Sequence, residues 1–305
     1  MRVVVTGGAG FIGAHTCGAL VAGGHEVVAF DDLSTGRSEN LQGTGASLVV
    51  GTILEPENLD AVFTDADAVV HLAARSSVPR SFDEPRATVD VNVAGTVHVL
   101  DAVVRAGRGA HVVVASSSTV YGSNPALPKH EGLEPRPMNP YGISKLAAEA
   151  AAFASEADVL VFRFFNVFGP MQTATTTYAS VVPAFIDAAL RDAPLPVHGD
   201  GRQTRDFTYV GAVATAVADA VGRRVVDERP VNLAFGSRVS VLELADAIGA
   251  VLGRQLKLDF RSGRCGDMRD TQADTRRFSA LFPDADPVDL KEGLQATIDW
   301  FRSNL

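Results

Sequence analysis

Short runs of β-branched residues alternate with stretches of helical spacing through the first half of the chain, and this alternation limits the possible folds more than any other feature. The strand-like runs are 3–6, 26–31, 48–51, 68–72, 111–116 and 159–164, and the helical stretches are 12–22, 58–63, 89–105 and 141–157. The strand-like runs are apolar on both faces, which is typical of parallel strands covered by helices on both sides. Because crossover connections are right-handed, we predict an α/β fold with a doubly wound parallel sheet of the Rossmann type.

The alternation lapses near residue 165, where prolines begin to interrupt the helical stretches. These prolines are Pro170, Pro183, Pro194 and Pro196. We therefore predict a Rossmann domain over 1–165 and a smaller mixed α/β domain over 166–305. The boundary is approximate, and segments of the second part can return to the first. Ligands of open α/β sheets bind at the carboxyl ends of the strands, so the second domain is expected to close over a ligand there.

The composition narrows the class of protein. The 305 residues include 27 basic and 36 acidic side chains, and the net charge of −9 disfavours a nucleic-acid partner. Cys17 and Cys265 are the only cysteines, and the seven histidines lack metal-ligand spacing, so we predict no disulfide framework and no metal. The amino terminus has no signal-peptide pattern, and no window approaches the ~20 apolar residues of a membrane span. We expect a soluble cytoplasmic protein without a membrane partner.

A glycine-rich turn follows the first strand and opens a helix. Residues 7–13 read Gly-Gly-Ala-Gly-Phe-Ile-Gly, and Asp31 ends the second strand about 20 residues on. Amide groups at the start of a helix favour a pyrophosphate, and Asp31 can accept hydrogen bonds from the adenosine ribose. Asp31 would repel a 2′-phosphate and so favours NAD, although the nearby Arg37 leaves NADP open. The alternative is a tight turn with a surface aspartate.

A second group of residues has the chemistry of a hydride-transfer site. Tyr141 and Lys145 are four residues apart at the start of a predicted helix, so both lie on one helix face. A nearby ammonium lowers the pKa of a tyrosine and lets it act as a base. Ser117 follows the strand 111–116 and would lie at the same sheet edge. The alternatives are an amphipathic helix end and polar residues that only form a turn.

These residues occur in an ordered set of motifs that resembles the extended short-chain dehydrogenase/reductase superfamily, and within it the NAD-dependent nucleotide-sugar 4-epimerases of the UDP-hexose type. The matching segments are 6–13, 31–36, 71–74, 92–96, 116–122, 139–145 and 163–170, with 199–207 and 264–267 resembling a clamp for the nucleotide diphosphate. The resemblance implies that Tyr141 is the base, that Ser117 is the catalytic hydroxyl and that Lys145 also grips the nicotinamide ribose.

The resemblance also implies the residues that surround the two ligands. The NAD-binding residues would be Gly7, Gly10, Phe11, Ile12, Gly13, Asp31, Asp32, Ser34, Thr35, Gly36, Thr52, Ile53, Leu72, Ala73, Ala74 and Arg75, together with Tyr141 and Lys145. The substrate-binding residues would be Ser117, Ser118, Thr119, Tyr141, Asn166, Thr177, Val182, Arg205, Arg264, Asp267 and Thr271. The pair Thr52-Ile53 departs from the family's usual Asp-aliphatic pair, which implies weaker contacts with the adenine.

The activity implied is redox-neutral C4 epimerisation of a UDP-sugar through a 4-keto intermediate. The sugar stays open among glucose/galactose, N-acetylhexosamine and glucuronate/galacturonate types. Thr271 stands where epimerases restricted to plain hexoses have a tyrosine, so an N-acetyl group is an admissible substituent. Alternatives are a dehydratase, reductase or decarboxylase of the same superfamily, although Ser118 and Thr119 replace the dehydratase Asp-Glu pair, and a catalytically silent NAD-binding regulator. Members of the family commonly dimerise through the helices that correspond to 89–105 and 141–157.

Overall fold

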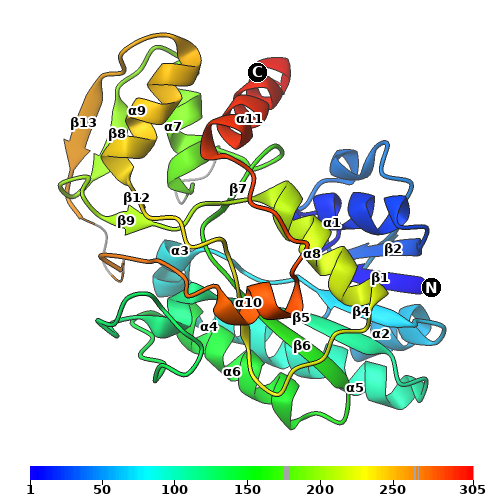
Figure 1. Ribbon diagram of the computed structural model, residues 1–305. Helices are drawn as coiled ribbons and strands as arrows, with labels where there is room; N and C mark the ends of the chain where they lie inside the picture. The colour runs from blue at the N-terminus through cyan, green and yellow to red at the C-terminus, as the bar shows by residue number, and fades with distance from the viewer. Residues whose placement is uncertain (175–178, 264–265, 267, 305) are drawn as a thin grey trace.

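A parallel sheet of seven strands forms the centre of the protein, and the described residues are 1–174, 179–263, 266 and 268–304 of a computed structural model (Figure 1). The strand order is β11-β6-β5-β4-β1-β2-β3. The strands are β1 (Arg2–Thr6), β2 (Glu26–Asp31), β3 (Ser47–Val50), β4 (Ala68–His71), β5 (His111–Ser117), β6 (Asp158–Phe164) and β11 (Val231–Leu233). This order confirms the predicted doubly wound α/β fold. The strand order reverses between β1 and β4, where ligands of such sheets bind.

Consecutive residues of β1 point to opposite faces of the sheet and therefore enter different cores. Val3 and Val5 pack with residues of α1 (Phe11–Ala22) and α8 (Val210–Gly222) on one face. Val4 packs with residues of α2 (Pro56–Phe63), α5 (Gly95–Ala106) and α6 (Pro140–Ala154) on the other. Burial on both faces explains why the strands are continuously apolar rather than alternating.

The predicted helix over 89–105 is part of a longer helical stretch. It consists of α4 (Pro85–Val89), the π-helical turn η2 (Asp90–Ala94) and α5. Among the described residues, only this stretch, Pro85–Ala106, is long and apolar enough to cross a membrane, by length and composition only. The mean hydropathy of its most apolar 18 residues is 1.3, and 44% of these residues are buried. This stretch contains the charged residues Arg86, Asp90, Asp101 and Arg105, so it is not an uninterrupted run of apolar residues. The stretch packs against α2 and α6.

A second core lies beside the sheet domain (Figure 1). It is formed by α7 (Val181–Leu190), α9 (Val241–Leu252), α11 (Leu290–Asn304) and β8 (Leu195–His198), and β13 (Leu258–Arg261) pairs in parallel with β8. The remaining short elements are η1 (Ser38–Leu41), α3 (Val78–Asp83), η3 (Ser118–Tyr121), α10 (Arg276–Leu281), the parallel pair β7 (Val167–Phe168) and β10 (Thr208–Tyr209), and the antiparallel pair β9 (Thr204–Arg205) and β12 (Val239–Ser240). After residue 166 the chain returns to the sheet domain with α8 and β11.

The turn between β1 and α1 has no room for side chains. A Cβ atom at Gly7, where φ is +70°, would lie 2.7 Å from the backbone nitrogen of Ala73. A Cβ atom at Gly13 would lie 2.1 Å from the carbonyl oxygen of Gly7. Gly10 caps α1 without a side-chain hydrogen bond. The glycines therefore bring backbone amides of the helix start close to the carboxyl end of β4, as a bound pyrophosphate requires.

We predict that Gly13→Ala destabilises the protein by about 2 kcal/mol or more, because the new methyl group overlaps a backbone oxygen that cannot move independently of the turn. Urea denaturation followed by circular dichroism measures this. The matched control is Gly18→Ala in the same helix, where the nearest atom to the new Cβ would be 3.9 Å away. This control should gain up to ~1 kcal/mol from helix propensity. Equal stability of the two variants would contradict the tight packing of the turn.

Candidate active site

Asp31 joins the end of β2 to the glycine turn. Its side chain is 7% exposed, and its two carboxylate oxygens accept hydrogen bonds from the backbone nitrogens of Ala9 (3.0 Å) and Leu33 (2.9 Å). Burial raises the pKa of Asp31, while these two amides act in the opposite direction. Each carboxylate oxygen keeps a lone pair for a ribose hydroxyl. Asp31 is thus buried, unlike the surface aspartate of the alternative interpretation, and it fits an adenosine ribose.

The other predicted NAD residues line the same edge of the sheet. Asp32, Ser34 and Thr35 are exposed in the loop after β2, and the Asp32 carboxylate accepts a hydrogen bond from the Ser34 backbone. Ile53 is 5% exposed and packs against Gly95 of α5. The half-buried predicted residues that follow β3 and β4 are Thr52, Leu72, Ala73, Ala74 and Arg75. The glycine cradle, the buried aspartate and this open edge together fit a dinucleotide.

The predicted catalytic residues meet at the carboxyl end of β5. Asn139 caps α6 by accepting a hydrogen bond from Gly142, and this places Tyr141 and Lys145 on successive turns. The Lys145 ammonium donates to the carbonyl oxygen of Ala115 in β5 at 2.9 Å. Ser117 is the last residue of β5, and its hydroxyl lies near enough to the Tyr141 phenol to lower the pKa of that phenol. The sheet and one helix therefore hold the three side chains together.

Burial shifts the pKa values of both Tyr141 and Lys145. Burial raises the pKa of Tyr141 to about 12, and the Ser117 hydroxyl partly offsets this. Burial lowers the pKa of Lys145 to about 8, and the carboxylate of Glu149 acts in the opposite direction. Near neutral pH Lys145 is still mainly an ammonium, so it can stabilise a phenolate that forms at Tyr141. Tyr141 therefore needs positive charge nearby before it can act as a base.

The predicted substrate residues come from both parts of the chain. Ser118 and Thr119 belong to η3, where the Thr119 hydroxyl donates to Ser117 at 2.9 Å. Thr271 donates to Asn166 at 3.4 Å and is 1% exposed. Two further predicted residues are Arg205, 8% exposed and donating to the carbonyl oxygens of Thr204 and Arg269, and Val182, which lies in the second core. Thr177, Arg264 and Asp267 lie outside the described residues.

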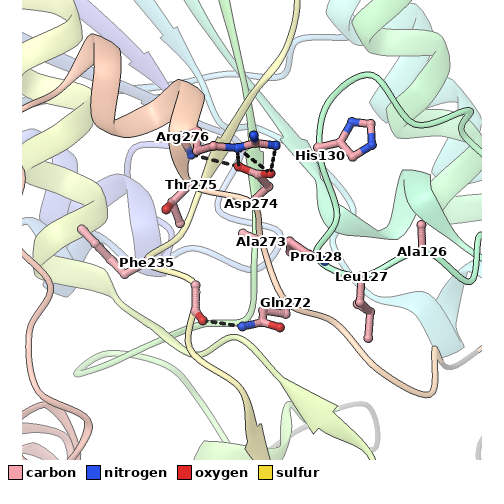
Figure 2. Close-up of a pocket in the computed structure, with 11 residues that line it drawn as sticks. Ala126, Leu127, Pro128, His130, Phe235, Gln272, Ala273, Asp274, Thr275 and Arg276 are labelled. Carbon is pink, nitrogen blue, oxygen red and sulfur yellow. Dashed lines mark hydrogen bonds and ion pairs between the residues drawn. The ribbon is translucent and has the colours of Figure 1, made fainter.

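An open cavity of about 660 Å³ lies beside the segment that follows Thr271, and none of the predicted site residues lines it (Figure 2). Its polar side chains are largely satisfied by neighbours. Arg276 pairs with Asp274 at 2.6 Å, and the Gln272 amide donates to the carbonyl oxygen of Gly236 at 3.0 Å. Figure 2 shows both contacts on the wall of the cavity. The predicted chemistry therefore lies at the sheet edge rather than here.

Two buried polar residues support the site, although neither is among the residues predicted to bind NAD or the sugar. Asn92 in η2 accepts from the Arg75 backbone at 2.8 Å and donates to Ser144 of α6 at 2.9 Å. His71 lies between the hydroxyls of Thr6 (2.7 Å) and Thr96 (2.9 Å), and burial lowers the pKa of His71 to about 3. His71 is therefore a neutral structural group rather than a general base. The sequence signal that could have identified both residues is a polar side chain within an otherwise apolar helix or strand.

The described residues contain no group of three or more histidine, cysteine, aspartate or glutamate side chains arranged to hold a metal ion.

Comparisons with known proteins identify the family. Residues 3–234 match the model of the "NAD dependent epimerase/dehydratase family". The chain is 36% identical to the UDP-glucose 4-epimerase of Mycolicibacterium smegmatis over 99% of both chains, and 32% identical to UDP-glucuronic acid decarboxylase 1 of Xenopus tropicalis over 100% of this chain and 73% of that protein. A solved structure, UDP-N-acetylglucosamine 4-epimerase from Methanobrevibacter ruminantium M1 in complex with UDP-N-acetylmuramic acid, is 32% identical and superimposes with a TM-score of 0.93, covering 100% of this chain and 99% of that one. The chain belongs to the NAD-dependent epimerase/dehydratase family, as its motifs predicted.

Proposed function

We propose that this protein is an NAD-dependent UDP-sugar 4-epimerase. The observation that carries the proposal is the meeting of Tyr141, Ser117 and Lys145 at the carboxyl end of β5, next to a dinucleotide cradle. The relatives named above include two UDP-sugar 4-epimerases, which supports the same reaction class. In this proposal the sheet domain binds NAD and the part that begins at residue 166, apart from α8 and β11, binds the nucleotide sugar.

In the proposed mechanism the protein moves one proton and holds one oxygen. Bound NAD⁺ would supply reversible acceptance of a hydride from C4 of the sugar. The sugar is a 4-keto compound between removal of the hydride and its return. The Tyr141 phenolate removes the proton from O4, and Ser117 donates a hydrogen bond to the same oxygen. Lys145 stabilises the phenolate and would contact the nicotinamide ribose of bound NAD. The diphosphate stays bound near Arg205, Arg264 and Asp267 while the sugar turns, and Tyr141 returns the proton after the turn.

The products formed from UDP-sugars distinguish this proposal from its alternatives. C4 epimers of the supplied sugar indicate an epimerase, a UDP-pentose with CO₂ indicates a decarboxylase, and stoichiometric NADH indicates a dehydrogenase. Binding without turnover indicates a silent regulator. NMR spectroscopy of reactions with UDP-glucose, UDP-N-acetylglucosamine and UDP-glucuronate separates all four outcomes, and the absence of C4 epimers from every sugar would overturn the proposal.

We predict that Tyr141→Phe lowers kcat by about 10³-fold, since it removes the proton acceptor alone and general base catalysis contributes about 10²–10⁴-fold. The NAD content of the purified protein and its Tm should stay close to those of the parent. Tyr209→Phe is the control, because Tyr209 is a half-buried tyrosine of β10 that packs on Phe168. A kcat within threefold of the parent for Tyr141→Phe would remove Tyr141 from the mechanism.

We propose that the residue at 271 controls access of substituents at C2 of the sugar. Thr271 is buried beside Asn166, and a larger side chain there would extend into the space used by an N-acetyl group. Thr271→Tyr should lower kcat/KM for UDP-N-acetylglucosamine relative to UDP-glucose by about tenfold or more, the equivalent of ~1.4 kcal/mol. Thr271→Val, which has nearly the same volume, should leave the ratio unchanged. An unchanged ratio for Thr271→Tyr, in a variant that retains its Tm, would show that this residue does not select the C2 substituent.

We further propose that the enzyme is a cytoplasmic homodimer joined through α6 and the helical stretch formed by α4, η2 and α5. Apolar side chains are exposed along this surface at Val89 (43%), Val97 (38%), Val104 (39%) and Ile143 (54%). The three valines are separated by eight and seven residues, so they lie along one helix face. An apolar face of this kind is suited to an isologous contact between two copies.

Light scattering at micromolar concentration should therefore give twice the chain mass of 32.0 kDa. Val97→Glu/Val104→Glu should give the monomer mass, because the contact would bury unpaired charges. Val226→Glu is the control, since Val226 is 52% exposed and lies outside both helices. A monomeric parent protein would reject the dimer.

A further inference from the structure

A buried ion pair lies directly behind the proposed catalytic residues. Glu149 of α6 and Arg163 of β6 are each 3% exposed. The Arg163 guanidinium donates to both carboxylate oxygens of Glu149, with Nε···O 2.9 Å and Nη2···O 2.7 Å. The Ser116 hydroxyl donates to the same carboxylate. One carboxylate therefore joins the catalytic helix to β5 and β6 at once.

Residues of this network lie close in the sequence to two of the proposed catalytic residues. Lys145 precedes Glu149 by one helical turn, and Ser117 follows Ser116 at the end of β5. A shift of α6 along the sheet would move Tyr141 and Lys145 relative to Ser117, and it would also break the contacts of Glu149 with Ser116 and Arg163. The ion pair thus fixes the same separation that the proposed proton transfer needs.

The rest of the network holds Arg163 in place. Its guanidinium lies 4.8 Å from the centre of the Tyr121 ring, and Nη1 has no hydrogen-bond partner. The Tyr121 hydroxyl donates to Asn232 of β11 at 2.6 Å. Burial opposes the charge of Arg163, but Glu149 and Tyr121 together more than offset it, so the pKa of Arg163 is raised. Arg163 is therefore a fixed cation whose orientation is set by a ring on one side and a carboxylate on the other.

We infer that Glu149 is a positioning residue for the proposed reaction: with Arg163 and Ser116 it locks α6 against the end of β5. A pair that served stability alone would be replaceable by apolar side chains of similar volume, because buried ion pairs are often neutral or costly in free energy. This inference rests on the proposed function, because it assigns Glu149 to the same Tyr141, Ser117 and Lys145 site.

The charged and titratable surroundings of Lys145 agree with this role. Tyr141 and Glu149 face it from α6, and His71 faces it from β4 as a neutral group. On the neighbouring elements, Arg163 and Tyr121 belong to the interior network described above. The charged side chains of α3, α4 and α5 pair nearer the surface, as in Arg80–Glu84, Arg86–Asp90 and Arg105–Asp60. Glu149 is thus the anion that favours the Lys145 ammonium.

Two variants test the inference. Glu149→Gln keeps the side-chain shape and removes the charge, so the pKa of Lys145 should fall and the alkaline limb of the kcat profile should move to lower pH by about half a unit or more. In that variant kcat should fall by about tenfold or more while KM stays within about threefold. Glu149→Leu/Arg163→Met removes both charges together, so it leaves no unpaired guanidinium and should fold even where the single variant does not. It should keep the Tm near that of the parent, yet retain the kcat deficit.

Hydrogen exchange gives a readout that is independent of activity. Amides of residues 113–122 should exchange faster in the double variant, whereas those of α11 should not change. Asp219→Asn is the matched control, because Asp219 forms an exposed i,i+4 pair with Arg223 on α8. It should leave the kinetics and the exchange unchanged.

A double variant with the parent's kcat, alkaline limb and exchange rates would overturn the inference and leave the pair a stability element only. If the parent turns over no UDP-sugar, the proposed function fails, and the exchange of residues 113–122 still decides whether the pair positions α6.

Discussion

The hydrogen bond from the Lys145 ammonium to the Ala115 carbonyl oxygen is the contact on which the candidate site depends. It crosses from α6 to the middle of the sheet at 2.9 Å, and both groups are buried. A buried ammonium is unstable without acceptors and a nearby anion, and the structure provides one of each, in Ala115 and Glu149. Because Tyr141 is one turn away on the same helix, the contact that satisfies the lysine also brings the phenol to Ser117.

Much of the fold could be predicted because the first half of the chain has long, repeated signals. The run 111–116 predicts a strand that the structure extends by one residue to Ser117, and the stretch 12–22 predicts a helix that begins at Phe11. The sequence was less informative after residue 166. There β11 has only three residues, too few for a period to be visible, and its place beside β6 depends on packing with residues about 70 positions away.

The site residues could be predicted because their motifs are short and local in the sequence. The buried network around Glu149 could not, because its residues are far apart in the sequence. Tyr141 and Lys145 are four residues apart, and the glycine turn spans residues 7–13. The contacts of Glu149 with Ser116 and Arg163 span 33 and 14 residues, and Asn232 is 111 residues from Tyr121. Such contacts have no local pattern, so a buried glutamate in an alanine-rich helix looks like an ordinary polar residue of that helix. Only its 3% exposure in the folded protein identifies it.

The catalytic groups and the proposed nucleotide site belong to separately packed parts of the protein, and this arrangement suits the proposed reaction. Inverting a hydroxyl group at C4 requires the base and the hydride acceptor to stay fixed while the sugar presents first one face and then the other. The fixed groups sit on the seven-stranded sheet, where α6 is locked to β5 and β6 by Lys145 and Glu149. Arg205, which is proposed to hold the nucleotide, lies in β9, and β9 pairs with β12, whose Val239 packs on the second core. A rigid catalytic edge and a separately packed nucleotide site allow the diphosphate to remain bound while the sugar turns between them.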